Sequence, residues 1–417
     1  MKIEPRTLKG FRDFLPKDAR KRQYVLETLK RVFESYGFEP LETPALEYED
    51  ILTGKYGTEG DKLMYRFTDN GERKVAMRYD QTVPLARVVA QYQNELSVPF
   101  KRYQIQNVWR AENTQKGRYR EFLQVDADIV GSYSPLADGE VIAMVVKCLE
   151  KLGFSAQSGS PSGGKNFQIL INDRSVFTKL VDDGILTEAE MPKIVRAIDK
   201  IKKIGDEGVI EEIMSEGFTK EKATEILKTI KAQEKTDALE DISIYLENLN
   251  LDKKIIKYDP TLARGLDYYT GLIFEVEIEG YEVGSIAGGG RYDNLIGMFA
   301  GREIPAVGFA FGFDRLVETM EIMNLFPTNL YTSIALVAFA TPELQEKALK
   351  IADELRNKKI NCEVYPEDVN LEKQLKYADK KQIPFVVIVD ENKLVLKNMN
   401  ERTQEELTLD QILKQIL

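Results

Sequence analysis

The chain has 417 residues, of which 43% are hydrophobic, and it carries a formal net charge of −10. This length exceeds that of one ordinary core and predicts two or three domains. No histidine is present, although a chain of this length would carry about eight on average. A Ser-His-Asp triad, a histidine general base and a histidine-ligated zinc site are therefore excluded. The acidic charge also argues against nucleic-acid binding over the whole surface, so an RNA partner would need local basic patches.

Neither a membrane segment nor an export signal is indicated. The chain has no apolar run of about 18 residues, and its first six residues lack the apolar core of a signal peptide. We therefore expect a cytoplasmic protein that does not enter a membrane. Cys148 and Cys362 lie in apolar or strand-like contexts, and we expect both to be reduced structural thiols.

Residues 1–172 mix helix and strand patterns. The spacing of apolar residues predicts an amphipathic helix over 18–36 that ends at Gly37. Two further helices are predicted over 82–92 and 138–152, and two strands over 101–110 and 119–130. A Gly/Ser/Pro cluster at 158–164 predicts a loop.

The composition changes twice in the rest of the chain. Over 173–255, Val, Leu and Ile recur at helical spacing among many Lys and Glu, which predicts a helical insertion. Over 256–326, strand signals at 272–289 precede helices near 291–299 and 312–324, so we expect the insertion to split a mixed antiparallel domain. Over 327–417, apolar runs at 333–339, 362–365 and 385–389 alternate with helical segments at 342–357 and 371–381. That alternation predicts a small α/β domain with a largely parallel sheet.

The two strands predicted over 101–110 and 119–130 have one polar face. Side chains alternate between the two faces of a strand. One face therefore collects Arg, Gln and Asp, and the other is apolar: the polar set is Arg102, Gln104, Gln106, Arg110, Phe122, Gln124, Asp126 and Asp128. A solvated sheet face would explain this pattern. The long basic loop 111–119 favours a phosphate-bearing ligand above the polar face instead.

Three later segments carry polar or glycine-rich patterns. Residues 261–271 hold Arg264 beside a glycine, then an Asp and two Tyr, a pattern that a turn leading into a strand would also explain. Residues 288–293 contain three consecutive glycines, which let a backbone approach a ligand closely or form a tight turn. Residues 308–315 are predicted to be a strand that enters a helix, with Arg315 in the first turn of that helix.

Taken in this order, the segments resemble the class II aminoacyl-tRNA synthetases, and specifically the histidyl-tRNA synthetase family. Residues 110–112 and 118–122 resemble motif 2, residues 308–315 motif 3, and the region around Thr43-Pro44 motif 1. Segments 262–269 and 288–293 resemble the two histidine-specific motifs. The resemblance covers essentially the whole chain. It implies an α+β fold: an antiparallel-sheet catalytic domain (1–172 and 256–326) with a helical insertion (173–255), followed by an anticodon-binding α/β domain (327–417).

The resemblance implies a reaction and its phosphate-binding residues. ATP and L-histidine form histidyl-adenylate and diphosphate, and histidine is then transferred to tRNA(His). Arg110 and Arg264 are the expected catalytic residues at the α-phosphate and the carboxylate, with Arg264 in the place that other class II enzymes give to a metal ion. The expected ATP-binding residues are Arg110, Glu112, Arg118, Phe122 and Arg315. Mg²⁺ is expected on the β- and γ-phosphates, and no metal ligand is assigned to the protein.

The resemblance also implies the contacts of the amino acid. Asp80, Gln81 and Thr82 are expected at the α-amino group. The imidazole is expected between Gln124, Asp128, Tyr268 and Tyr269, with Arg110 and Arg264 completing the histidine site. A neutral imidazole has one donor and one acceptor. A carboxylate and a tyrosine hydroxyl would match them, and would reject analogues that lack these groups.

Two sets of basic residues recur at helical spacing and are candidates for contact with tRNA phosphates. Lys373, Lys376 and Lys380 lie in the C-terminal domain, and Lys193, Arg196, Lys200 and Lys203 lie in the insertion. Ordinary solvated helix faces would give the same spacing. A homodimer is implied by the motif 1 resemblance alone.

Two alternatives remain open. A synthetase-like regulatory subunit of histidine biosynthesis would bind histidine without charging tRNA, but such proteins tend to lose the phosphate-binding arginines and the anticodon domain. A threonyl- or prolyl-type synthetase is disfavoured by residues 264–269 and by the absence of a zinc-binding His/Cys set.

Overall fold

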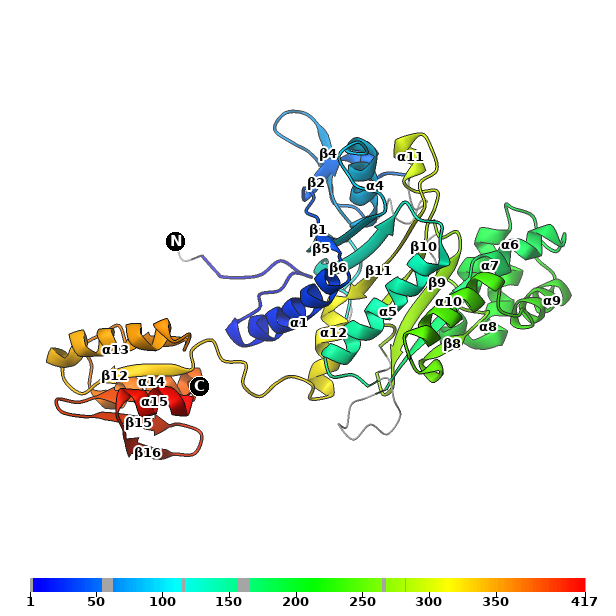
Figure 1. Ribbon diagram of the computed structural model, residues 1–417. Coiled ribbons are helices and arrows are strands. Elements are labelled where there is room, and N and C mark those ends of the chain that lie inside the picture. The colour runs from blue at the N-terminus through cyan, green and yellow to red at the C-terminus, as the bar shows by residue number, and fades with distance from the viewer. Residues whose placement is uncertain are drawn as a thin grey trace. The chain divides into compact units, whose positions relative to one another are not determined.

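The computed structural model describes residues 3–54, 63–114, 117–155, 166–264, 268–281 and 283–416. The loop predicted at 158–164 lies outside these ranges, as do residues 265–267 of the predicted histidine motif. The described chain divides into two compact units, with the main boundary between Phe326 and Pro327 (Figure 1). Each unit is described by itself.

A large sheet forms the centre of the first unit. Its described strands, in spatial order, are β1 (Glu39–Pro40), β5 (Phe100–Trp109), β6 (Glu121–Val130), β11 (Ala306–Gly312), β10 (Ala287–Arg291), β9 (Leu272–Ile278), β7 (Phe167–Asp173) and β8 (Ile256–Tyr258). Neighbours from β5 to β7 are antiparallel, and only the short edge strands β1 and β8 pair in parallel. The antiparallel sheet predicted for this part of the chain is confirmed.

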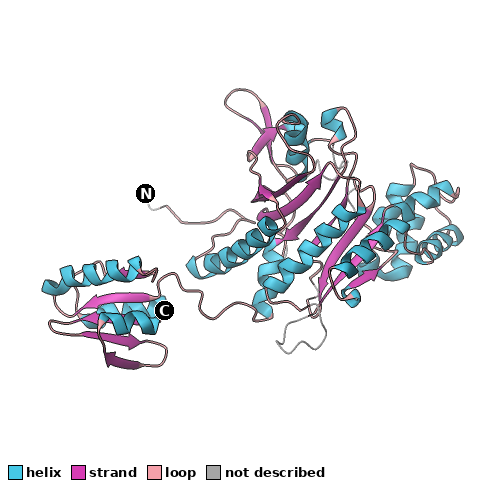
Figure 2. Cartoon of the chain, viewed as in Figure 1, coloured by secondary structure: helices cyan, strands magenta, loops and turns pink. Residues whose placement is uncertain are grey.

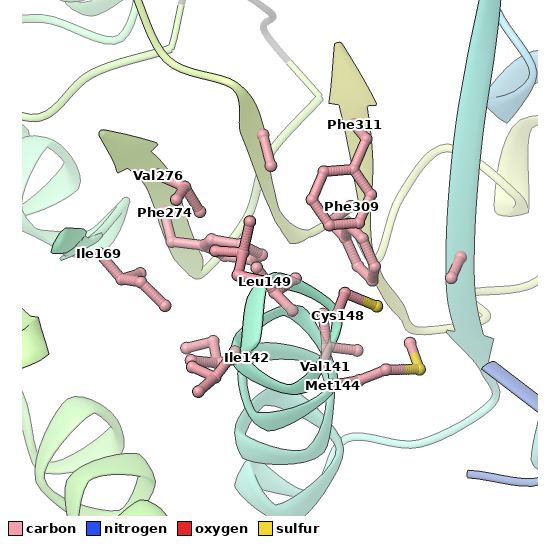
Figure 3. Close-up of a cluster of buried hydrophobic side chains, with 14 of the residues drawn as sticks. Val141, Ile142, Met144, Cys148, Leu149, Ile169, Phe274, Val276, Phe309 and Phe311 are labelled. Atoms are coloured by element: carbon pink, nitrogen blue, oxygen red, sulfur yellow. The ribbon is translucent and has the colours of Figure 1, made fainter. Parts of the chain in front are cut away.

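Helices cover one face of this sheet (Figure 2). They are α1 (Pro16–Ser35), α5 (Pro135–Lys151), α10 (Asp237–Asn248) and α12 (Phe313–Ile322), and their buried residues share one hydrophobic cluster with the apolar side chains of the strands. Around α5, Ile142 and Leu149 pack towards Ile169, Phe274 and Val276, as Figure 3 shows. Because strand side chains alternate, this packing leaves the opposite face of β5, β6, β10 and β11 for the polar residues.

The first unit also contains a smaller sheet and three short helices. The strands, in spatial order, are β2 (Leu46–Tyr48), β4 (Lys74–Met77) and β3 (Arg66–Thr68), and the helices are α2 (Glu49–Leu52), α4 (Thr82–Gln91) and α11 (Gly297–Ala300). The helix predicted near 291–299 was therefore placed too early. Residues up to Arg291 continue β10, because the Arg291 guanidinium is held by Asp138 at 2.8 Å and by the carbonyl of Ser132 at 2.8 Å.

The helical segment after β7 contributes to two cores. Helices α6 (Ser175–Asp182), α7 (Met191–Ile198), α8 (Ile201–Ser215) and α9 (Lys220–Lys231) share a hydrophobic cluster of their own. Helix α10 instead packs on α5 within the main core, where the ring of Tyr245 lies directly against Gly139. A short 3-10 turn, η1 (Lys253–Ile255), then leads into β8. The segment is thus helical, as predicted, but its last helix belongs to the sheet.

The second unit is a five-stranded sheet between helices. Its strands, in spatial order, are β13 (Cys362–Val364), β12 (Ala335–Phe339), β14 (Phe385–Val389), β15 (Leu394–Asn398) and β16 (Thr403–Glu406). Its helices are η2 (Pro342–Leu344), α13 (Gln345–Asn357), α14 (Leu371–Lys381) and α15 (Leu409–Ile416). Strands β13, β12 and β14 are parallel, but β15 and β16 are antiparallel. The prediction of a largely parallel sheet was wrong for this last part, because only β12, β13 and β14 have the continuous apolar runs that were used to recognise strands.

Replacing Phe274 with alanine should lower the free energy of unfolding of the first unit by about 3–5 kcal/mol. Phe274 is fully buried between the sheet and α5, and an alanine there leaves a cavity in packed surroundings. Urea unfolding followed by the fluorescence of Trp109, the one tryptophan of the chain, measures the change. The matched control is Phe67→Ala, because Phe67 is 46% exposed and should cost less than about 1 kcal/mol. Equal losses would contradict this account of the core.

Candidate functional site

A cavity of about 500 Å³ opens on the polar face of the large sheet. Its walls come from β6 and the loop that precedes it, from β10 and β11, and from the segments around Asp80, Arg264 and Arg315. The described residues that line it include Asp80, Thr82, Arg110, Glu112, Arg118, Phe122, Gln124, Asp126, Asp128, Arg264, Tyr268, Tyr269, Tyr292, Ala310, Asp314 and Arg315. Of the thirteen residues predicted for the site, only Gln81 is absent from this lining.

Gln81 supports the site from behind instead of facing the cavity. Its side chain is fully buried, and its amide nitrogen donates to the carbonyl oxygens of Gln106 at 2.8 Å and Gln124 at 3.2 Å. Its Oε1 accepts no hydrogen bond from the described protein, and the expected contact of Gln81 with an α-amino group stays a prediction. Its neighbours Asp80 and Thr82 do face the cavity.

At three glycines of the site, functional side chains occupy the space that a Cβ atom would need. A Cβ atom added to Gly288 would overlap Nη1 of Arg264, and one added to Gly308 would overlap Oδ1 of Asp128. A Cβ atom on Gly290 would lie 2.9 Å from the ring of Tyr269. The close approach predicted for residues 288–290 is therefore made at Gly288 by the side chain of Arg264, and at Gly290 by the carbonyl oxygen of Leu272 and the ring of Tyr269.

Positive charge gathers towards one end of the cavity. Arg110 follows β5, where its Nε donates to the carbonyl of Tyr79 at 2.9 Å and its guanidinium lies 5.2 Å from the centre of the Phe122 ring. Arg118 lies near Glu112, with 3.6 Å between Nη1 and Oε2. The hairpin of β5 and β6 thus presents two guanidiniums and an aromatic ring side by side.

Two further arginines reach the cavity from other segments. Arg315, in the first turn of α12, donates to the carbonyl of Ser285 at 3.1 Å. Arg264 pairs with Glu275 of β9 at 3.2 Å. Burial opposes the charge of Arg264, but the neighbouring Tyr269 and Glu275 outweigh it and raise the pKa of this guanidinium. Guanidiniums fixed in this way suit the charge of a polyphosphate.

A network of carboxylates and tyrosines forms the other end. Asp128 lies six residues along β6 from Phe122, which is about 20 Å in an extended strand. It forms an ion pair of 2.7 Å with Arg102, whose side chain is completely buried. The hydroxyl of Tyr292 donates to Oδ1 of Asp128. Burial raises the pKa of Asp128, and Arg102 opposes that rise.

Two stacked tyrosines close this end of the cavity. The hydroxyl of Tyr268 donates to that of Tyr269 at 3.1 Å, and the two ring centres lie 4.4 Å apart. Burial raises the pKa of Tyr268 well above its usual value, so this hydroxyl stays neutral. A neutral hydroxyl and a carboxylate facing the same space can serve a ligand that has both a donor and an acceptor.

Three residues of this end were not assigned to the site from the sequence. Arg102 and Asp126 were placed on the polar face of the hairpin by alternation, but nothing indicated that they would be buried. Tyr292 stands two residues after Gly290, and only the pairing of β10 with β11 brings it near β6. The positions of all three residues depend on the register between distant strands, which a single sequence does not reveal.

The predicted basic patches differ from each other. Lys373, Lys376 and Lys380 are exposed on the single helix α14. In the insertion, α7 ends at Ile198 and α8 begins at Ile201, so its four basic residues do not share one continuous helix. Two of these residues, Lys193 and Lys200, also pair with Glu216 and Glu212 at 3.1 and 2.8 Å. The expected stripe in the insertion is therefore a mixed-charge surface.

The described ranges hold neither a metal-ligand cluster nor a helix that could cross a membrane. Within them, no group of three or more Cys, Asp or Glu side chains is arranged to hold a metal ion. None of the helices that the structure describes combines the length and the apolar character needed to cross a bilayer. Both cysteines are free thiols, with Cys148 buried and Cys362 partly buried.

Comparisons with known proteins agree with this geometry. The sequence profile of the Histidyl-tRNA synthetase family matches residues 10–316, and that of an anticodon binding domain matches residues 333–417. The chain is 39% identical to the histidine–tRNA ligase of Cytophaga hutchinsonii, with 99% of this chain and all of that relative covered.

Solved structures extend the likeness to the fold. The crystal structure of histidyl-tRNA synthetase from Nostoc sp. PCC 7120 superposes with a TM-score of 0.85 at 31% identity, over 100% of this chain and 99% of that one. A Bacillus halodurans protein described as an ATP phosphoribosyltransferase regulatory subunit/histidyl-tRNA synthetase shares the fold, with a TM-score of 0.73 at 22% identity over 91% and 98% of the two chains. With one family profile over most of its length and relatives aligned end to end, this chain belongs to the histidyl-tRNA synthetase family, a branch of the class II aminoacyl-tRNA synthetases.

Proposed function

We propose that this chain is a histidine–tRNA ligase, which joins ATP and L-histidine into histidyl-adenylate and transfers histidine to tRNA(His). The observation that carries the proposal is the polarity of the one cavity described above: guanidiniums at one end, and a buried carboxylate with paired tyrosines at the other. An ATP molecule and a histidine placed end to end would match these two ends.

The first step requires the carboxylate of histidine to attack the α-phosphorus of ATP. Both reactants are negatively charged, so the step needs fixed positive charge where they meet and a geometry that holds the attack in line. Arg110 and Arg264 supply that charge. Arg264 lies over Gly288, beside the carboxylate end of the site, and Arg110 lies over Phe122 at the nucleotide end. Diphosphate leaves towards Arg118 and Arg315.

The nucleotide and its metal ion follow from the same arrangement. Phe122 offers a ring on which adenine can stack, and Glu112 offers acceptors for its amino group. Mg²⁺ would be held chiefly by oxygens of the β- and γ-phosphates, because Mg²⁺ usually takes few protein ligands and retains water. The ion would offset phosphate charge during the transfer.

The second substrate is tRNA(His). The anticodon-binding match over residues 333–417 and the exposed lysines of α14 support contact of the second unit with the anticodon arm. A homodimer and a cytoplasmic location also belong to this proposal, since they accompany motif 1 and the tRNA-charging reaction in the family.

The regulatory-subunit alternative shares this fold, as the Bacillus halodurans protein illustrates. The features against it are chemical. Arg110, Arg264 and Arg315 all line the cavity, and the anticodon-binding unit is present. A protein that only senses histidine has no use for guanidiniums at the nucleotide end.

Replacing Arg264 with alanine should reduce histidine-dependent ATP–diphosphate exchange by about 10²- to 10³-fold, because charge on the reacting groups loses its fixed partner. Histidine should still bind through Asp128 and Tyr269, but about 10-fold or more weakly, because its carboxylate loses Arg264. Exchange assays and equilibrium binding of histidine measure the two effects separately.

Arg73→Ala is the matched control for this change. Arg73 is also paired with a carboxylate, at 2.7 Å from Asp69, but its side chain is 60% exposed and does not line the cavity. Exchange by this variant should equal that of the unchanged protein. Near-normal exchange by Arg264→Ala would contradict the catalytic role of Arg264, and no exchange by the unchanged protein would contradict the proposed function.

Replacing Lys376 with glutamate should raise the KM for tRNA several-fold and leave diphosphate exchange unchanged, because a lost phosphate contact weakens RNA binding without touching the cavity. Lys350→Glu is a closely matched control. Both lysines are more than 70% exposed and pair with a glutamate one helical turn away at 2.7 Å, but Lys350 lies on α13. Aminoacylation at varied tRNA concentration separates the two variants. Equal KM values for them would argue against an RNA-binding face on α14.

A further inference from the structure

Strand register arranges the floor of the cavity in two rows. In the Asp128 row, Asp128 of β6 lies opposite Gly308 of β11, which lies opposite Gly290 of β10. In the Asp126 row, Asp126, Ala310 and Gly288 are aligned in the same way. The two rows are two residues apart, which is about 7 Å along a strand, and their side chains point to the same face.

Different side chains stand above the far end of each row. The ring of Tyr269 occupies the space over Gly290, so the Asp128 row places a carboxylate and a tyrosine on opposite sides of a ligand. The guanidinium of Arg264 occupies the space over Gly288, so the Asp126 row places a carboxylate opposite a cation. Between these two lies only the methyl group of Ala310, which lines the cavity.

Asp126 has an unused acceptor in this row. Its side chain lines the cavity while being only 3% exposed. One oxygen, Oδ2, accepts a hydrogen bond from Gln124 at 2.9 Å. The other, Oδ1, accepts none from the described protein. A buried acceptor without a donor is costly, and a donor supplied by a ligand would remove that cost.

We propose, as an extension of the proposed function, that Asp126 binds the α-ammonium group of histidine. The Asp126 row then binds both charged groups of the amino acid. The ammonium lies beside Asp126, the carboxylate beside Arg264, and the α-carbon above Ala310. The imidazole reaches the Asp128 row, since the spacing of the rows is comparable to the span of histidine from its ammonium nitrogen to its ring nitrogens.

The charges around Asp126 suit this role. Asp80, before α4, and Asp128, on β6, add negative charge, and Arg102 of β5 offsets part of it. Besides Asp80 and Asp128, the charged and titratable groups that line the cavity are Tyr79, Arg110, Glu112, Arg118, Tyr119, Arg264, Tyr268, Tyr269, Tyr292, Asp314 and Arg315. Burial raises the pKa of Asp126 to about 8, against the effect of Arg102. The charged form of free Asp126 is therefore the costly one, which agrees with an acceptor that has no donor. An ammonium group beside it favours the carboxylate, so binding of histidine expels the carboxyl proton to solvent.

The test compares three ligands on Asp126→Asn, a substitution of nearly equal shape. Histidine has both the ammonium and the carboxylate, histamine lacks the carboxylate, and imidazole-4-propionate lacks the ammonium. Loss of a charged hydrogen bond should weaken histidine and histamine by ~10- to 100-fold and leave imidazole-4-propionate nearly unchanged. Calorimetry at pH 7 in two buffers of different ionisation enthalpy should also detect proton release on histidine binding by the unchanged protein and none by Asp126→Asn.

Asp138→Asn is the control for a buried carboxyl group outside the site. Burial raises the pKa of Asp138 to about 6, and Arg291 is its partner, but Asp138 does not line the cavity. Its substitution should change the unfolding temperature and leave the three affinities unchanged. The unfolding temperature of Asp126→Asn, measured in parallel, shows whether that variant is folded, and proton release by the unchanged protein tests the proposal without any variant.

Several outcomes would overturn the inference. Equal losses for all three ligands would mean that Asp126 acts on the ring or on the cavity as a whole. Unchanged histidine affinity, or histidine binding by the unchanged protein without proton release at any pH between about 4 and 9, would remove the ammonium contact. In each of these cases the proposed ligase activity could still stand, because diphosphate exchange reports it directly. If the unchanged protein neither bound histidine nor catalysed exchange, both proposals would fall.

Discussion

The ion pair between Arg102 and Asp128 is the interaction on which the geometry of the site depends. The two residues face each other across β5 and β6, and neither side chain is more than 5% exposed. Burying two charges is expensive, and their attraction offsets that cost only when the geometry is good and other hydrogen bonds support it. The hydroxyl of Tyr292, which comes directly after β10, gives such support. The pair fixes the position of the Asp128 carboxylate in the sheet. The tyrosines, the three glycines and Asp126 are arranged around that carboxylate.

The two faces of the sheet have separate tasks. The apolar face packs on α1, α5, α10 and α12, which makes the strands rigid. The polar face can then hold charged groups at fixed distances without relying on loops. Class II chemistry needs such a platform, because it depends on positioning and fixed charge rather than on a nucleophilic side chain. The absence of histidine from the chain therefore removes nothing that this reaction uses.

Much of this arrangement could be predicted from the sequence, and the remainder has identifiable physical reasons. Alternation along residues 101–130 correctly separated the apolar face of the hairpin from the face that carries Gln124 and Asp128. Element types were right for most long segments, since their periodicity is strong. Two kinds of feature were not predictable. Short edge strands such as β1, β8 and β16 have too few residues for a pattern. The burial of Arg102, the inward position of Tyr292 and the supporting role of Gln81 depend on pairings between distant strands, which leave no local signal.

The glycine floor has a consequence for how this site can change in evolution. Gly288, Gly290 and Gly308 already lack side chains, so no substitution there can deepen the space under Arg264, Tyr269 and Asp128. Mutation at these positions can only subtract volume and displace a functional group. A pocket with walls made of side chains can be enlarged in small steps by trimming them, and so can drift towards larger substrates. At these three positions the lower limit of the pocket is the polypeptide backbone itself, so enlargement of the pocket is left to the positions that carry side chains.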